Sequence, residues 1–394
     1  MQLISEATEK SISGGSWIRR MFEAGIALKS QYGADNVCDF SLGNPDLPPP
    51  PQVAQALRAL ADEADKPFAL GYMPNGGYPW ARELMASHVG KEQGITIGQD
   101  DVVLSCGAAG ALNAFFKAAL NPGDEVLGIA PYFVEYGAYV ANHGGMFRIV
   151  QSQPDTFALD MDALDKAIGP KTRAIIINSP NNPTGQIYSQ SEMEALAALL
   201  TQKTAQFGRP VFLVSDEPYR FLAYDGIIVP SVLALYPYSI VVNSFSKSLC
   251  IPGERTGYAA LSPLMEGRET LVAGMILANR ILGYVNPPAV GQHILKHAIE
   301  TQVDPNIYRK RRDLMASILT DAGYDFFLPK GAFYFFPKAP GGDDIAFVDK
   351  LREEKILVVP GTGFGGPGHF RIAFCVGEEV IARAATGLKK AIGK

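Results

Sequence analysis

Cysteine is scarce in this chain of 394 residues, which has only four: Cys38, Cys106, Cys250 and Cys375. They are far apart and form no CxxC pair, which argues against a zinc site and a disulfide-stapled fold. The five histidines form no ligand cluster either. His293 and His297 are four residues apart, but no HExxH motif or third ligand accompanies them, so a pair on a helix surface is the better interpretation. We expect no metal site.

Long apolar runs and basic runs are also missing. The longest apolar stretches are as short as VFLV at residues 211–214, far below the roughly 20 residues of a membrane-spanning helix. The N-terminal MQLISEATEKSISGG has no apolar core of the signal-peptide type. A formal net charge of -5 without a basic cluster argues against nucleic acid or a membrane surface as partner. We therefore expect a cytoplasmic protein.

Apolar residues are abundant, at 47% of the chain, which suffices for a large core and more than one domain. From about residue 52, short apolar runs alternate with helical segments. The runs that predict strands are 102–104, 125–129, 174–177, 211–214 and 239–242. Such alternation predicts an α/β fold with a mostly parallel sheet covered by helices on both faces. Ligands of such sheets bind beyond the carboxyl ends of the strands.

A Gly/Pro-rich segment, LGNPDLPPPP at residues 42–51, must be extended and indicates a crossing between domains. Near the C-terminus, residues 331–337, 356–359 and 370–374 are expected to form strands of a smaller sheet. We predict three segments. Residues 1–48 form an N-terminal arm and part of the small domain, residues 49–290 form the large domain, and residues 291–394 form the small C-terminal α/β domain.

The segment NSFSKSLCIPGERTGY follows the predicted strand 239–242 and places Lys247 among small hydroxyl residues. An amine held at the end of a strand can form a Schiff base with a carbonyl cofactor. Ser244, Ser246 and Arg255 suit a dianionic phosphate, which favours short donors and a planar guanidinium. A lysine near serines is usually a solvated loop residue, so this segment needs support from the rest of the chain.

Two other strand ends supply that support. Asp216 ends the run 211–215, where a carboxylate would keep a pyridine nitrogen protonated and make the ring an electron sink. Tyr219 and Asn182, the latter in the rigid loop NSPNNPTG, are natural donors to the phenolic oxygen of the same ring. Taken singly, these residues fit a helix cap, a packing tyrosine and an ordinary turn.

Two further strand ends carry weaker signals. In SCGAAGAL, the small residues Gly107, Ala108 and Ala109 open a helix, whose N-terminus can bind a phosphate through backbone N–H groups. Helix–sheet packing explains a Gly-Ala loop equally well. Phe133 in PYF stands where an aromatic face would stack on the pyridine ring, although a core phenylalanine is the alternative.

The ordered set GAAGAL, PYF, NSPNNPTG, SDEPY, SFSKS and ERTGY resembles the aspartate aminotransferase family of fold-type I pyridoxal-phosphate enzymes, over nearly the whole chain. The resemblance implies the fold-type I architecture and pyridoxal 5'-phosphate as cofactor. It implies that Lys247 is the Schiff-base lysine and proton shuttle and that Asp216 pairs with the pyridinium. Tyr219 and Asn182 would bind the phenolic oxygen. Phe133 replaces the tryptophan often found at the stacking position.

The resemblance also implies residues beyond this set. Tyr72, in GYMPNGGYP, is similar to the tyrosine that reaches the phosphate of a neighbouring subunit, which implies a homodimer with shared sites. Arg371, in FRIAF, is similar to the clamp for the substrate α-carboxylate. Gly43 lies in the segment that closes over substrate.

The expected reaction is a ping-pong transfer of an amino group from an L-amino acid to a 2-oxo acid such as 2-oxoglutarate. One subgroup of the family carries a distal-carboxylate lysine where this chain has Ala109. Arg280 resembles a distal-carboxylate arginine donated by a partner subunit, one residue out of register, which would favour aspartate. The aromatic segment FYFF at 333–336 would favour an aromatic donor. A carbon–sulfur β-lyase is the alternative function, and a non-catalytic PLP-sensing regulator is a distant one.

Overall fold

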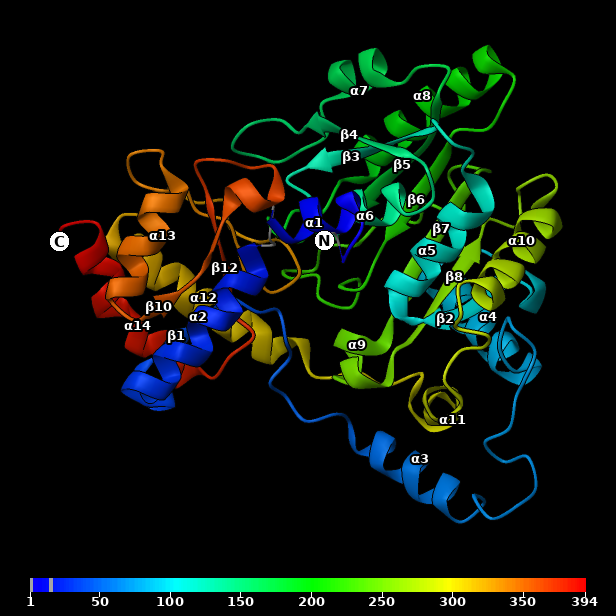
Figure 1. Cartoon of the computed structure of the whole chain (residues 1–394), viewed down its shortest axis with the longest axis horizontal. Coiled ribbons are helices and arrows are strands. Elements are labelled where there is room, and N and C mark those ends of the chain that lie inside the picture. The colour runs from blue at the N-terminus through cyan, green and yellow to red at the C-terminus, as the bar shows by residue number, and fades with distance from the viewer. Residues whose placement is uncertain (1–2, 14–16) are drawn as a thin grey trace.

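The computed structural model describes residues 3–13 and 17–394, and its largest feature is a seven-stranded sheet (Figure 1). The strand order is β2-β8-β7-β6-β5-β3-β4. The strands are β2 (Val102–Cys106), β3 (Glu125–Ala130), β4 (Met146–Gln151), β5 (Thr172–Asn178), β6 (Phe212–Asp216), β7 (Ser239–Ser244) and β8 (Thr256–Leu261). Only β8 runs antiparallel to its neighbours, β2 and β7. The five predicted strands and the mostly parallel sheet are confirmed.

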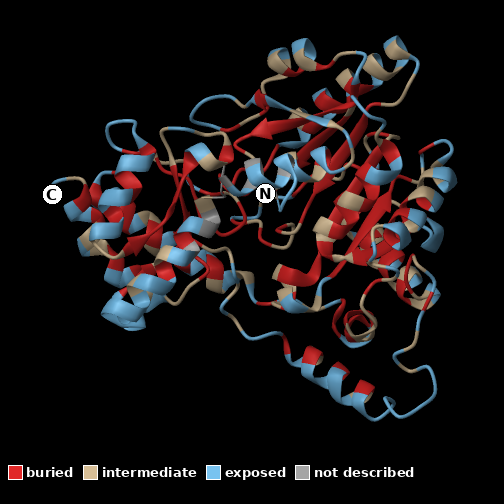
Figure 2. Ribbon diagram, viewed as in Figure 1, coloured by how far each residue is buried: buried red, intermediate tan, exposed pale blue. Residues whose placement is uncertain are grey.

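Helices cover both faces of this sheet. The helices of this part of the chain are α3 (Pro51–Ala61), α4 (Pro79–Gln93), α5 (Gly107–Ala119), α6 (Tyr136–Ala141), α7 (Met161–Ala167), α8 (Gln190–Phe207), α9 (Phe245–Ser248), α10 (Arg268–Ile281) and α11 (Ala289–Ala298), of which α3 packs on α11. Successive residues of a strand point to opposite faces, so Leu213 of β6 packs into one core and Val214 into another. Figure 2 shows the strands buried and the helices exposed along their outer sides. The apolar runs of the sequence are continuous because both faces are covered.

A smaller group of elements lies beside this sheet (Figure 1). Its helices are α2 (Trp17–Tyr32), α12 (Pro305–Ala322), α13 (Asp344–Glu353) and α14 (Glu378–Ala391). A three-stranded sheet joins β11 (Val359–Pro360), β12 (Phe370–Ala373) and β9 (Tyr334–Phe335). The N-terminal β1 (Cys38–Asp39) pairs in parallel with β10 (Ile356–Leu357). The predicted strand 356–359 is thus wrong in one respect, because it divides at Val358 between two sheets.

The N-terminal segment packs with the C-terminal one, since Met21 of α2 and Cys38 of β1 share a core with Phe370. Helix α11 instead packs against α3, and its Ile294 and Leu295 join a core of the large sheet. The bounds 1–48, 49–290 and 291–394 remain a prediction, because packing alone does not define which segments move as one body. The remaining helix is α1 (Glu6–Ser13). In the described residues, no helix is long and apolar enough to span a bilayer.

Local sequence positions the strand ends. Helix α5 begins directly after β2, at Gly107, and α9 begins directly after β7, without intervening loop residues. Gly257 of β8 allows this arrangement, because a Cβ there would lie 2.4 Å from the backbone carbon of Gly107. The N-terminus of α5 is therefore pressed against the sheet beside the start of α9.

Candidate active site

A cavity of about 340 Å³ lies at the carboxyl ends of the parallel strands. It brings together most of the residues that the sequence singled out: Gly43, Ala108, Ala109, Phe133, Asn182, Asp216, Tyr219, Ser244, Ser246, Lys247, Arg255 and Arg371. Gly107 lies beside it, under the Arg255 guanidinium. Tyr72, which is 91% exposed, and Arg280, which is also exposed, do not line the cavity of their own chain. Both were predicted to act across a subunit interface.

Lys247 projects from the short helix α9, which follows β7. Its Nζ donates a hydrogen bond to the carbonyl oxygen of Gly43, at 2.6 Å. Burial lowers the pKa of Lys247 below its usual range, and the positive charges of Arg371 and Arg255 act in the same direction. An amine with a lowered pKa is more often neutral near pH 7, as a nucleophile or a proton acceptor must be.

Asp216 is a buried carboxylate at the end of β6. Tyr136 Oη donates to its Oδ2 at 2.6 Å, and the side-chain amide of Asn178 donates to its backbone oxygen at 2.8 Å. Its Oδ1 is buried without a hydrogen-bond partner among the described residues. Burial raises the pKa of Asp216 to about 7, although the hydrogen bond from Tyr136 opposes this rise. A cationic N–H in the cavity would satisfy Oδ1 and restore the charged form.

Groups that bind anions gather in another part of the cavity, at the N-terminus of α5. The N-terminus of α5, with no side-chain cap, lies beside Ser244, Ser246 and Arg255. Arg255 adopts a left-handed backbone conformation (φ 51°), and its Nη1 donates to the carbonyl oxygen of Pro252 at 3.0 Å. Free helix N–H groups, two hydroxyls and a guanidinium make a cradle for a dianion.

Arg371 enters from the smaller sheet, on β12, and is only 2% exposed. Its Nη1 donates to Asn182 Oδ1 at 3.1 Å, and its Nη2 donates to the Ser41 carbonyl oxygen at 2.6 Å. Its Nε is buried with no partner among the described residues. The guanidinium also lies 4.8 Å from the centroid of the Tyr334 ring. A fixed guanidinium with one unmet donor is suited to bind a carboxylate.

Tyr219 and Gly43 both contact Tyr334. The hydroxyls of Tyr219 and Tyr334 are 2.8 Å apart. A Cβ on Gly43 would collide with the Tyr334 hydroxyl, so glycine is needed for the loop to approach this closely. Tyr334 thereby links the loop that contains Gly43 to Tyr219, which follows strand β6 of the large sheet.

Comparison with known proteins places this geometry in a family. Residues 35–388 match the family model "Aminotransferase class I and II". The chain belongs to this family. It is 32% identical to the aspartate/prephenate aminotransferase of Thermus thermophilus over 383 residues, covering 94% of each chain. It is 31% identical to the aspartate aminotransferase of Geobacillus stearothermophilus over 379 residues, covering 91% of this chain and 92% of that protein.

Solved structures agree with the family assignment. An amino transferase from Eubacterium rectale has a TM-score of 0.95 and 38% identity, and the match covers 99% of this chain and 98% of that one. The aspartate aminotransferase of Thermus thermophilus with maleate has a TM-score of 0.89 and 28% identity, and the match covers 99% of this chain and 100% of that one. The fold-type I class and the aminotransferase function are thus confirmed, and nothing favours the β-lyase or regulator alternatives.

This aminotransferase has cavity-lining residues that the sequence did not single out: Leu112, Glu135, Tyr139, Asn178, Pro218 and Pro252. Tyr334, from the aromatic segment 333–336 that would favour an aromatic donor, also lines the cavity. Tyr136, which holds Asp216, was missed as well. The segment PYFVEYGAY carries three of them, and only its Phe133 was selected. This segment follows a strand directly and is rich in polar and aromatic residues, a pattern that indicates a binding site.

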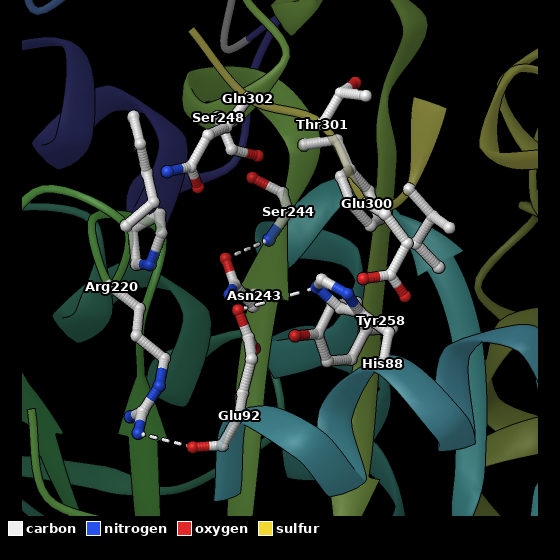
Figure 3. A pocket seen from close by; sticks show the side chains of 14 residues that line it. His88, Glu92, Arg220, Asn243, Ser244, Ser248, Tyr258, Glu300, Thr301 and Gln302 are labelled. Carbon is white, nitrogen blue, oxygen red and sulfur yellow. Dashed lines mark hydrogen bonds and ion pairs between the residues drawn. The ribbon is translucent and has the colours of Figure 1, made fainter. Parts of the chain in front are cut away.

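A second cavity of the aminotransferase, of about 310 Å³, adjoins the first, and Pro218 and Ser244 line both. Figure 3 shows His88 and Glu92 on one helix, facing the strands that carry Asn243 and Tyr258. His88 Nε2 lies 3.5 Å from a Glu92 carboxylate oxygen. Of these two cavities, Lys247, Asp216 and Arg371 line only the first.

Proposed function

We propose that the first cavity binds pyridoxal 5'-phosphate and transfers an amino group between an L-amino acid and a 2-oxo acid such as 2-oxoglutarate, by a ping-pong mechanism. One observation carries this proposal. The amine of Lys247, the buried carboxylate of Asp216 and the anion cradle at the start of α5 converge on the same cavity. These are three different chemical groups, and the cofactor needs all three.

The residues present fit this cofactor. Asp216 Oδ1, buried without a partner among the described residues, would accept from the protonated ring nitrogen. Ser244, Ser246 and Arg255, with the Gly107–Ala109 turn, would hold the phosphate. Phe133 would stack on the ring, and Asn182 and Tyr219 would donate to its phenolic oxygen.

The bound cofactor supplies an electron-withdrawing ring that stabilises the negative charge developing at the substrate α-carbon. The chain supplies the rest. Lys247, with its lowered pKa, would be the group that accepts the proton from the substrate α-carbon. Asp216 would pair with the ring nitrogen and favour its cationic form. Arg371 holds the α-carboxylate, which fixes the orientation of the Cα–H bond toward Lys247.

A homodimer is part of this proposal. Tyr72 is expected to reach the phosphate of the neighbouring subunit, and its 91% exposure leaves it free to do so. Phe68, four residues earlier, is equally exposed. Large apolar side chains exposed on neighbouring parts of the chain are typical of an interface. Arg280 would likewise act on the site of the partner subunit.

A single-turnover experiment tests the proposed function. The cofactor-loaded protein is mixed with one amino acid in the absence of any oxo acid. Transamination predicts a shift of the cofactor absorption band and one equivalent of 2-oxo acid per site, after which the reaction stops. Continuous release of pyruvate and ammonia from cystathionine, with no lasting shift, would instead identify a β-lyase. Absence of any cofactor band after addition of pyridoxal phosphate would overturn the proposal.

The Arg371→Lys variant tests the α-carboxylate clamp. Lysine keeps the charge but loses the planar fork, so we expect kcat/KM for every donor to fall by about 100-fold, mainly through KM. Steady-state kinetics at saturating oxo acid measures this. Arg148→Lys is the matched control, because Arg148 is half-exposed and pairs with Glu125 on the sheet's edge. Equal kinetics for the two variants would contradict the role of Arg371.

A further inference from the structure

Glu135 is a carboxylate in the active-site cavity that the proposed mechanism does not use. It stands at the residue before helix α6, two positions after Phe133, and it lines the cavity. Its Oε2 is buried and has no hydrogen-bond partner among the described residues. Leaving such an oxygen unpaired is costly, so an unpaired one facing a binding cavity indicates a ligand group that pairs with it.

The neighbours of Glu135 do not satisfy this oxygen, although Arg371 is close enough to act on the carboxylate electrostatically. Burial raises the pKa of Glu135, and Arg371 opposes that rise. Tyr139, on the next turn of the chain, and Tyr334 feel its negative charge. The carboxylate therefore lies in the cavity within electrostatic reach of Arg371, the proposed α-carboxylate clamp.

The charges that line the cavity decide what kind of side chain it accepts. Three cations line it, and the proposed mechanism uses all of them: Lys247 for proton transfer, Arg255 for the phosphate and Arg371 for the α-carboxylate. None remains within this chain's lining to neutralise a second carboxylate. Asp216 has the ring nitrogen as its partner. Within the described lining, Glu135 is the one charged residue without an assigned partner.

We propose that Glu135 is a specificity-determining residue that pairs with a cationic group at the end of the donor side chain. The donor class is then a basic L-amino acid, one whose side chain ends in an ammonium or guanidinium group. This inference rests on the proposed function, because it assigns the side-chain end of the same substrate. A second carboxylate would face Glu135 as a like charge, so aspartate and glutamate are disfavoured as donors, and 2-oxoglutarate as acceptor would react with a higher KM than a monocarboxylic 2-oxo acid. The alternative, a distal carboxylate neutralised by Arg280 of the partner subunit, predicts the reverse order. Several relatives are named for aspartate, and a difference in this pocket would separate the chain from them.

Three acids that lack an α-amino group and have equal carbon-chain length provide a direct test: 5-aminopentanoate, pentanoate and glutarate. Each has the carboxylate that Arg371 would bind, and they differ only in a distal ammonium, methyl or carboxylate group. Their dissociation constants are measured by calorimetry on the cofactor-loaded wild type, on Glu135→Gln and on the control Glu353→Gln, an exposed position on α13. Wild type and control should bind 5-aminopentanoate at least about tenfold more tightly than pentanoate, and glutarate most weakly. In Glu135→Gln these differences should largely vanish.

Reaction rates complete the test. The single-turnover rates of ornithine, norvaline and glutamate are compared in the same three proteins. Glu135→Gln should slow ornithine by at least about tenfold relative to norvaline and accelerate glutamate. An equal loss for all three donors would identify a general role in proton transfer, and glutarate binding most tightly to the wild type would indicate a dicarboxylate site. Either result overturns the inference while leaving transamination intact. Failure of every donor to react would overturn the proposed function instead, and the calorimetric order would still decide the role of Glu135.

Discussion

The Lys247→Ala variant is expected to lower kcat for transamination by about 10⁴-fold. Its side chain is the one amine in the described cavity lining, and burial together with Arg371 and Arg255 lowers its pKa toward the working range. Without it, no group of that lining stands ready to carry a proton from the substrate α-carbon. Single-turnover absorbance measurements give the rate directly.

Lys66→Ala is the matched control for this loss. Lys66 is exposed and pairs with Glu63 on the surface, so its removal should leave kcat unchanged. If Lys247→Ala retained activity within tenfold of this control, Lys247 could not be the proton carrier. Lys247→Arg separates charge from chemistry, because arginine keeps the positive charge but does not deprotonate. It should be as slow as the alanine variant.

The Asp216→Asn variant is expected to lower kcat by about 10²- to 10³-fold, because the ring nitrogen would lose the charge that keeps it protonated. Asparagine preserves the shape and still accepts from Tyr136, so the loss would report the charge alone. The control is Asp165→Asn, an exposed aspartate that pairs with Lys203 far from the cavity lining. Unchanged kcat in Asp216→Asn would exclude the assigned role.

The same substitution should stabilise the cofactor-free protein at alkaline pH. The pKa of Asp216 is raised to about 7 in the folded state, against about 3.9 in an unfolded chain. Between these values the folded state binds the extra proton, so the free energy of unfolding falls as pH rises from about 4 to 7. About three pKa units correspond to about 4 kcal/mol, which Asp216→Asn should recover at pH 8. Urea unfolding at pH 5 and pH 8 measures it, and a gain that is equal at both values would contradict the shift.

The sequence predicted five of the seven strands of the large sheet and missed β4 and β8. The five predicted strands are mostly apolar because both faces of the sheet are covered and their residues are buried. The edge strand β4 was missed, since its residues are mostly exposed and include Arg148 and Gln151. Strand β8 was missed because its TGYAAL sequence has few large apolar residues, and because the alternation of helix and strand does not predict an antiparallel neighbour.

The site residues likewise divide into those that the sequence predicted and those that it missed. Those within local motifs, such as Lys247 and Asp216, could be selected because the spacing from a strand end predicts where the side chain lies. The segment PYFVEYGAY offered a general signal, but the sequence did not show the roles of Tyr136 and Glu135. The bond from Tyr136 to Asp216 joins positions 80 residues apart. Only the folded cavity reveals that a carboxylate oxygen of Glu135 has no partner among the described residues. Tyr72 and Arg280 stay predictions, because their roles lie across a subunit interface.

The most direct test of the central claim is to find which lysine carries the cofactor. The protein is loaded with pyridoxal phosphate, treated with borohydride to fix the cofactor on the amine that binds it, digested and analysed by peptide mass spectrometry. We expect one modified site per chain, at Lys247 in the segment NSFSKSLC. Modification at another lysine, with the Lys247 peptide unmodified, would contradict the assignment of this cavity as the catalytic site.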